Sequence, residues 1–174
     1  MTHFDDIYEI AADNYGLITA GEAADAGATS IELSRWVKSG RLEHRGHGLY
    51  KLVRYIPTDH DRFAEAVALV GPEAYLVGTS VLAMHNLGFV NPSKITVATE
   101  RRVRRKLPEW VEVVPAQGCV PTSYEGVPSQ SVADALRACK GKVMRERLAS
   151  AVEEAYAKGL LKDEDHKRLK GEFL

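Results

Sequence analysis

Cysteine is scarce in this chain, and it has no long apolar run. Only Cys119 and Cys139 occur among 174 residues, so we expect no disulfide framework and a reducing, cytoplasmic setting. No apolar stretch approaches the roughly 18 residues that a membrane-spanning helix requires. Residues 1–14 lack the basic and apolar regions of a secretory signal. We therefore expect a cytoplasmic protein that makes no membrane contact.

A strong net charge is also missing. The 23 Lys and Arg residues are balanced by 24 Asp and Glu residues, for a net charge of −1. The chain is therefore not a bulk polycation, and any binding of nucleic acid has to rely on a local basic patch. The apolar content of 45% is enough to bury a core, and the length fits one or two small domains.

The sequence also lacks recognisable catalytic and metal-binding patterns. The segment Gly78 to Ser80 resembles the start of a nucleotidyltransferase site, but the acidic pair Asp59 and Asp61 lies upstream of it instead of following it. Nuclease, P-loop and serine hydrolase patterns do not occur. His44 and His47 have no further ligand nearby at metal-binding spacing. We expect no enzyme, no cofactor and no bound metal.

The most informative stretch runs from Thr29 to Leu52. Thr29 is followed three residues later by Glu32, which is the spacing of a capping box and predicts that a helix begins here. Gly40 follows the last apolar position of this helix, where a left-handed C-terminal cap favours glycine. The pattern predicts a helix from Ser30 to Ser39.

This helix has two different faces. Leu33 and Trp36 fall on one side of the 3.6-residue period, whereas Arg35 and Lys38 fall on the opposite side with Ser34 beside them. The helix should therefore bury one face and expose a basic one.

The flanking segments complete a recognisable module. Short strands at 42–45 and 49–52 are separated by Gly46, His47 and Gly48, a composition suited to a hairpin turn. Two further helices are expected upstream, at 5–14 and at 20–26 after the capping residue Thr19. Three helices followed by a hairpin are the layout of a winged helix-turn-helix.

Charge is distributed unevenly along this module. Residues 30–54 contain six Lys and Arg residues against two Glu residues, whereas residues before Ser30 contain six carboxylates and no Lys or Arg. One face of a small domain should therefore be basic, which suits a phosphate backbone.

The rest of the chain indicates a second, α+β domain. We place the boundary at 55–58, which gives an N-terminal domain of residues 1–56 and a C-terminal domain of residues 57–174. Strands favoured by β-branched residues alternate with amphipathic helices before the chain ends in helices alone. The expected strands are 74–77, 94–99, 110–115 and 122–127, and the expected helices are 59–70, 79–86 capped by Thr79, one introduced by Pro128, 142–158, and one capped by Asp163.

A basic run lies between the second and third of these strands. It comprises Arg101, Arg102, Arg104, Arg105 and Lys106, beside the single carboxylate of Glu100. Two interpretations stay open for it: a solvated hairpin tip, or a contact with nucleic acid or with an acidic partner.

Several segments resemble the AbiEi-type antitoxins of bacterial abortive-infection systems, which belong to type IV toxin–antitoxin systems. The resembling segments are Gly16 to Ala20, Ser39 to Leu42, Gly48 to Leu52 and Ala74 to Leu82. The resemblance implies a winged helix-turn-helix that binds inverted repeats in its own promoter. It also implies a C-terminal domain that neutralises a nucleotidyltransferase toxin without forming a stable complex with it. Related N-terminal domains also occur without a toxin partner.

The resemblance also suggests which residues would contact double-stranded DNA. Ser30, Ser34, Arg35 and Lys38 map onto the third helix, and Arg45, Gly46, His47, Gly48 and Lys51 map onto the wing. We expect Arg35 to read a guanine and Arg45, His47 and Lys51 to contact phosphates, with Arg41 and the basic run at 101–106 extending the footprint. Ile31 lies on the basic side, where it would either touch a thymine methyl group or pack against the preceding turn; we favour packing.

The sequence therefore predicts an autorepressor that acts as an antitoxin. Two alternatives remain: a solitary winged-helix regulator without a toxin, and a protein-interaction module that uses its basic run to meet an acidic partner.

Overall fold

The computed structural model describes residues 2–174 and confirms the α+β class. The chain divides into two compact units, one ending at Leu69 and the other running from Val70 to Leu174. Across the described residues, no helix combines the length and the apolar character needed to cross a membrane.

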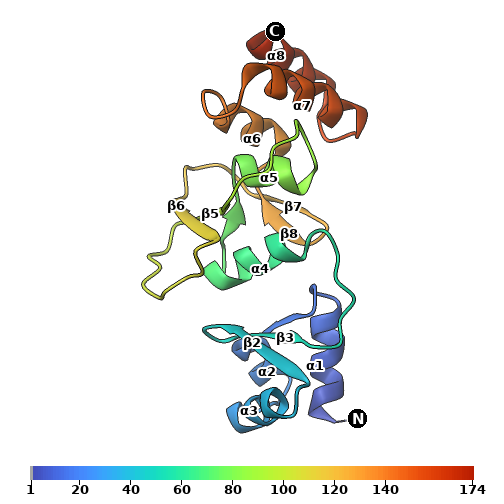
Figure 1. The fold of residues 1–174 in the computed structure, drawn as a ribbon, viewed down its shortest axis with the longest axis vertical. Coiled ribbons are helices and arrows are strands. Elements are labelled where there is room, and N and C mark those ends of the chain that lie inside the picture. The colour runs from blue at the N-terminus through green and yellow to red at the C-terminus, as the bar shows by residue number, and fades with distance from the viewer. Residues whose placement is uncertain (1) are drawn as a thin grey trace. The chain divides into compact units, whose positions relative to one another are not determined.

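The first unit contains helices and one small sheet (Figure 1). Its antiparallel sheet has the order β1-β3-β2, and the β2–β3 hairpin forms the predicted wing. β1 was not anticipated, and it pairs along its whole length with β3. The elements are α1 (His3–Ala12), β1 (Leu17–Thr19), α2 (Ala20–Asp25), α3 (Ser30–Lys38), β2 (Leu42–Gly46), β3 (Leu49–Leu52) and α4 (Asp61–Val70).

The core of this unit joins all three N-terminal helices to the sheet. Ile7 of α1, Ile18 of β1 and Leu33 and Trp36 of α3 are buried in one apolar cluster with Leu52 of β3. Burying side chains of this size contributes roughly 1.5–3 kcal/mol each. The predicted buried face of α3 is thus confirmed.

α4 lies on the first unit's side of the division up to Leu69, whereas the sequence pattern assigned it to the second domain. Two ion pairs connect it to the wing: Arg45 with Glu65, and Lys51 with Asp61. Neither pair shows in a hydrophobic pattern, because both join residues far apart in the chain.

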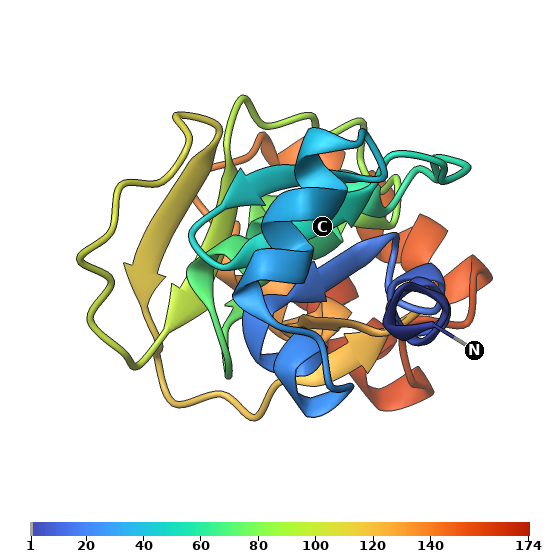
Figure 2. The same ribbon diagram turned by 90° about the horizontal axis from the view of Figure 1, so that it is seen from below.

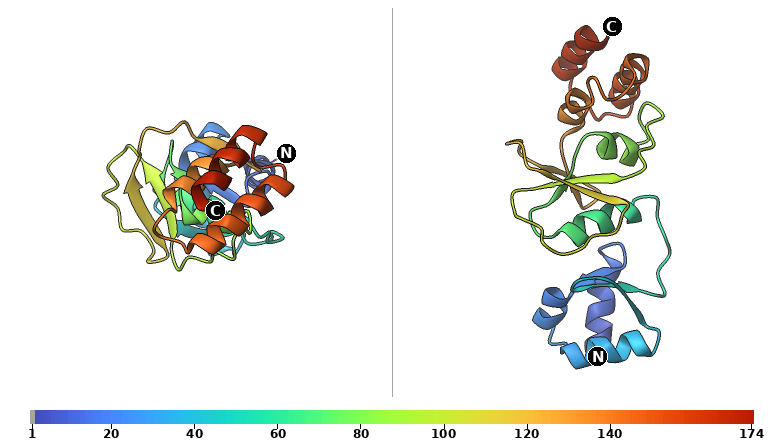
Figure 3. Two further views of the ribbon diagram at one scale, coloured as in Figure 1. Left: turned by 90° about the horizontal axis from the view of Figure 1, so that it is seen from above. Right: turned by 60° about the vertical axis from the view of Figure 1, so that its left-hand side comes forward.

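The second unit is built on a five-stranded sheet with the order β6-β5-β4-β8-β7. α5 and the three C-terminal helices lie on one side of this sheet (Figures 1 and 3). The elements are β4 (Tyr75–Leu76), α5 (Thr79–Met84), β5 (Ile95–Thr99), β6 (Val111–Pro115), β7 (Thr122–Tyr124), β8 (Val127–Ser129), α6 (Val132–Ala138), α7 (Arg145–Ala157) and α8 (Asp163–Phe173).

The basic run does not form a hairpin tip. β5 and β6 pair in parallel, from Ile95 opposite Val111 to Thr99 opposite Pro115. Two neighbouring parallel strands need a crossover connection that carries the chain back to the end of the sheet where the first strand began. A tight turn cannot do this. Residues 100–110 therefore form a crossover loop.

Three expected helix starts in this unit are wrong. Thr79 is the first residue of α5 and Gly78 is its N-cap, without a side-chain cap. Asp163 is likewise inside α8, whose N-cap is Lys162. Pro128 belongs to β8, which forms a hairpin with β7, and the cap of α6 is Ser131.

The Gly78 to Ser80 segment has a structural explanation. The backbone N–H of Gly78 donates to the side chain of Gln130 at 2.8 Å. The hydroxyl of Ser80, which is fully buried, accepts a hydrogen bond from the Thr96 backbone N–H at 2.7 Å. These bonds tie the start of α5 to the sheet, and Ser80 serves as a packing residue.

Gly88 provides a test of packing in the second unit. Its φ is +63°, and a Cβ there would lie 2.7 Å from the backbone oxygen of Arg147. We expect Gly88→Ala to lower the free energy of unfolding by about 2–4 kcal/mol, measured by urea denaturation, because α7 has to shift.

Gly159→Ala is the matched control for this variant. Its φ of +74° is similar, but nothing lies within 4 Å of the added Cβ. It should lose only about 1 kcal/mol from backbone strain. Equal losses for the two variants would contradict the close approach at Gly88.

Candidate nucleic-acid interface

The exposed face of α3 is the candidate interface. Ser30, Ser34, Arg35 and Lys38 are all exposed, and they line one shallow hollow of about 360 Å³ together with Ile31. Viewed as in Figure 2, α3 lies in front of the sheet of its own unit. These residues occupy one side of the helix because they lie three or four positions apart. The structure thus brings together the four residues that were predicted on this helix.

Ile31 differs from expectation. It does not pack against the preceding turn, since 71% of its surface is exposed. Leu33 and Trp36, on the opposite face of the same helix, are only 3% and 8% exposed. The helix is oriented by these two buried side chains, and that orientation leaves Ile31 outside.

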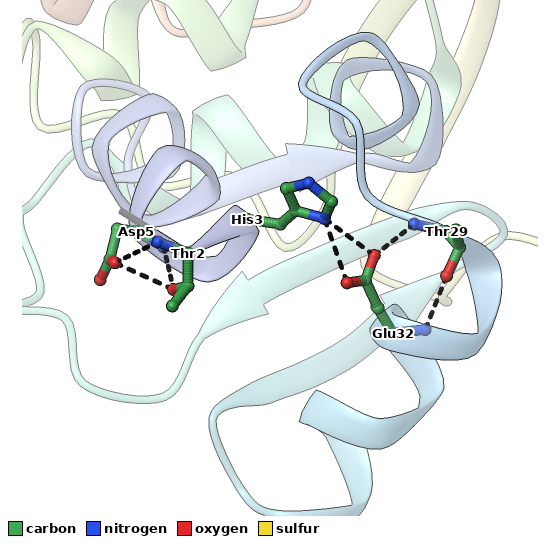
Figure 4. A network of polar contacts seen from close by, with 5 residues as sticks. All are labelled: Thr2, His3, Asp5, Thr29 and Glu32. Atoms are coloured by element: carbon green, nitrogen blue, oxygen red, sulfur yellow. Dashed lines mark hydrogen bonds and ion pairs between the residues drawn. The ribbon is translucent and has the colours of Figure 1, made fainter.

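The start of α3 is held by a polar network that reaches α1 (Figure 4). The predicted capping box is confirmed: the hydroxyl of Thr29 accepts from the Glu32 backbone N–H at 3.2 Å, and the Glu32 carboxylate accepts from the Thr29 N–H at 2.8 Å. His3 adds a contact from its Nδ1 to the same carboxylate at 3.1 Å. A second capping box, formed by Thr2 and Asp5, starts α1 beside it.

This network removes the one carboxylate of α3 from its exposed face. Glu32 is the only acidic residue in α3, and its oxygens are directed to Thr29 and His3. The face around Arg35 and Lys38 therefore receives no negative charge from its own helix.

The wing cations are placed differently. Arg45 forms a two-pronged ion pair with Glu65, at 2.5 and 3.1 Å, and also contacts Glu43 at 3.2 Å. Lys51 lies 3.6 Å from Asp61, and its side chain is 19% exposed. Both predicted phosphate contacts thus have carboxylate partners already. His47 is exposed at the hairpin turn.

Two cations near the end of α3 remain at the surface. Arg41 lies over the ring of Phe4, 4.9 Å from its centroid, and is exposed. Such stacking directs the guanidinium while leaving its N–H groups available. Arg54 is also exposed and lines a hollow with Arg41 and Phe4, although it was not among the predicted contact residues.

The basic run of the second unit is exposed throughout. Arg105 donates to the Val70 carbonyl oxygen at 2.7 Å, and Arg101 lies 3.3 Å from the Glu73 carboxylate. Arg102, Arg104 and Lys106 carry the rest of its charge.

The second unit also contains a cavity of about 290 Å³ beside Thr79, Glu112, Gln130 and Lys142. Cys139 and Tyr75 line it. Burial raises the pKa of the Cys139 thiol to about 11 and that of Tyr75 to about 12. Both groups are therefore protonated near neutral pH, so neither is poised to act as a nucleophile or a base. Cys139 is fully buried.

The described residues contain no cluster of side chains suited to binding a metal ion. Within residues 2–174, no group of three or more His, Cys, Asp or Glu side chains is arranged to hold an ion. His44 instead packs beside Tyr50, with ring centroids 5.2 Å apart.

The topology and the exposed face of α3 define the class of the first unit as a winged helix-turn-helix domain. Residues 5–53 match a family model described as "Transcriptional regulator, AbiEi antitoxin". The resemblance to AbiEi-type antitoxins is thus confirmed over this segment. The match ends before Ala74, so the resemblance of the second unit stays a prediction. The AbiEi antitoxin regulators are not a family of enzymes.

The other comparisons add little. No curated protein matches the chain. A solved structure, the crystal structure of RV2827C protein from Mycobacterium tuberculosis, covers 95% of this chain and 79% of its own, with 14% sequence identity and a TM-score of 0.41. At this level of similarity no functional argument follows from it.

The capping network should make stability depend on pH. The pKa of Glu32 lies below its usual value of 4.5, mainly because its carboxylate accepts the Thr29 backbone N–H, with a further contribution from His3. A lowered folded-state pKa stabilises the fold above pH 4.5, and this stabilisation is lost as the pH falls through the folded-state pKa. Glu32→Gln should therefore be less stable than wild type near pH 7, and the difference should shrink towards about pH 3. Urea denaturation across this range measures it, and a constant difference would contradict the assignment.

The ion pair between Arg45 of the wing and Glu65 should contribute to stability, although part of the Arg45 side chain is exposed. The Glu65 side chain is only 7% exposed, so Arg45→Ala leaves a buried carboxylate without its cation. We expect a loss of about 3 kcal/mol in the free energy of unfolding, measured by urea denaturation. Arg54→Ala removes an exposed cation from the same unit and should change stability by less than about 0.5 kcal/mol. Similar small losses for both variants would show that the Arg45–Glu65 pair is not formed in solution.

Proposed function

We propose that this protein is a sequence-specific, double-stranded DNA-binding autorepressor and the antitoxin of a type IV toxin–antitoxin system. The observation that carries the DNA-binding part is the exposed face of α3, which presents Arg35, Lys38 and two serine hydroxyls without a carboxylate from the same helix. An α-helix with such a face fits the major groove, where arginine recognises guanine through two hydrogen bonds. The match to the AbiEi regulator model supports the regulatory role.

The ion pairs of the wing bear on which cations we propose for the phosphate contacts. Arg45 and Lys51 would have to leave Glu65 and Asp61 before contacting phosphates, which costs the energy of those pairs. Lys38, Arg41 and Arg54 are exposed and belong to neither of these pairs, so they are the better candidates for phosphates in the first unit. The basic run at 101–106 offers a further set, which would extend the footprint.

The antitoxin part of the proposal concerns the second unit. We infer that it counters a nucleotidyltransferase toxin without forming a stable complex with it, in line with the family resemblance of Ala74 to Leu82. A growth assay tests this: where a nucleotidyltransferase is encoded beside this chain, its expression should arrest growth, and the full chain should restore it. Failure to restore growth, with DNA binding intact, would favour a solitary winged-helix regulator.

The DNA-binding part is tested by fluorescence anisotropy of the full chain on its own upstream duplex and on a scrambled duplex. We expect a preference of about 1,000-fold or more for the upstream duplex. Arg35→Ala should reduce that preference by about 1–3 kcal/mol, whereas the triple variant Arg102→Ala/Arg104→Ala/Lys106→Ala should weaken both duplexes alike. The triple variant should also reduce the slope of log affinity against log salt by about 3.

Equal losses on both duplexes for Arg35→Ala would remove its assignment as a base-reading residue. Equal and strongly salt-dependent binding of the wild type to both duplexes would overturn sequence-specific repression. That result would favour an interaction module whose basic surface meets an acidic partner.

A further inference from the structure

Ile31 is the one large apolar side chain on the otherwise polar face of α3. It is 71% exposed, whereas the other apolar residues of the helix, Leu33, Trp36 and Val37, are buried or half-buried. Leaving an isoleucine in water forgoes roughly 1.5–3 kcal/mol of hydrophobic stabilisation. Single exposed apolar residues are ordinary on protein surfaces. Ile31 is distinguished by its place, because it lies in the same hollow as Arg35 and Lys38 on the candidate DNA-contacting face.

The position of Ile31 is set by the geometry of the helix. It is the second residue of α3, and Ser34, Arg35 and Lys38 follow at three, four and seven positions. These spacings place all four on one face, and together with Ser30 they line the same hollow of about 360 Å³. The residues at the start of a recognition helix are those that reach the base edges.

The positive charge of this face indicates which apolar group Ile31 would contact. Arg35 and Lys38 supply two positive charges, and the carboxylate of Glu32 is held at the capping box by Thr29. An apolar group that sits within a polyanion, in the groove that admits a helix, is the C5-methyl group of thymine. Thymine displays this methyl group in the major groove, and cytosine lacks it.

We propose that Ile31 is a specificity-determining residue that reads the C5-methyl group of a thymine in the operator. This inference rests on the proposed DNA-binding function and deepens it. Ile31 and Arg35 are one helical turn apart, roughly 6 Å along the axis, and base pairs rise by about 3.4 Å. The thymine should therefore lie about one or two base pairs from the guanine that Arg35 reads.

Deoxyuridine tests the proposal directly, because it differs from thymidine only by this methyl group. Affinity is measured by fluorescence anisotropy for the full-length protein on three probes: the upstream duplex, the same duplex with every thymidine replaced by deoxyuridine, and a scrambled duplex. Wild type should bind the deoxyuridine duplex about fourfold more weakly for each thymine contacted. Ile31→Ala should lose a similar factor on the thymidine duplex and almost nothing further on the deoxyuridine duplex.

Three further variants separate apolar contact from helix effects. Ile31→Val retains the branched apolar end and should keep most of the preference for thymidine, whereas Ile31→Gln should lose it. Ile56→Ala removes an isoleucine that is 86% exposed outside α3 and should keep the full preference. Circular dichroism checks that each variant is folded, which we expect because both positions are exposed.

The outcomes are distinguishable. Wild type that binds the upstream and scrambled duplexes equally would overturn the proposed function and this inference with it. Specific binding by wild type with no difference between thymidine and deoxyuridine would overturn the role of Ile31 alone. Losses from Ile31→Ala and from deoxyuridine that simply multiply would also overturn it, because two groups in contact do not act independently.

Discussion

The orientation of α3 about its own axis is the constraint on which the candidate interface depends. Leu33 and Trp36 are buried in the core. The side chains on the opposite face of the same helix therefore have to point outward. The helix is also fixed at both ends. The capping box of Thr29 holds its start, and the N–H of Arg41 donates to the Trp36 carbonyl oxygen at its end. A helix fixed in this way keeps the backbone of Arg35 on the outer face, so no backbone ordering is needed when its side chain binds.

The distribution of carboxylates then decides where positive charge remains available. α4 supplies Asp61 and Glu65 to the wing, and Glu32 is used within the capping network. Acidic side chains therefore neutralise the hairpin from the α4 side while leaving the outer face of α3 positive. For a chain with a net charge of −1, this local separation is what allows attraction to a polyanion. The wing residue Arg45 consequently has a stabilising role as well as any contact it makes with DNA.

The sequence predicted those parts of the fold that depend on residues close together in the chain. The cap at Thr19, the capping box at Thr29, the turn at Gly48 and the buried face of α3 all depend on residues within four positions of one another. β1 was missed because three residues are too short for a periodicity, and its stability comes from pairing with β3, which lies 30 or more residues away. The parallel pairing of β5 with β6 was missed for the same reason, since strand direction is decided by long-range contacts.

The candidate site was predictable to a similar extent. Periodicity located the exposed face of α3, but it could not show that Arg45 and Lys51 meet α4, because ion pairs between distant elements leave no local signal. Ile31 was misjudged because its type suggested burial, whereas its position in the helix suggested exposure. Position prevailed, since Leu33 and Trp36 together bury more apolar surface than Ile31 could.

Ordering of the backbone before binding matters for the crossover loop of the second unit as it does for α3. A flexible basic loop would lose much conformational entropy on binding phosphates, by roughly 1–2 kcal/mol for each residue that becomes ordered. Here the loop spans two parallel strands, and Arg105 fastens it to the Val70 carbonyl oxygen. Part of the ordering cost is therefore met when the unit folds. Arg102, Arg104 and Lys106 lie in the same loop, so the phosphate contacts proposed for them would begin from a segment that Arg105 already attaches to its own unit.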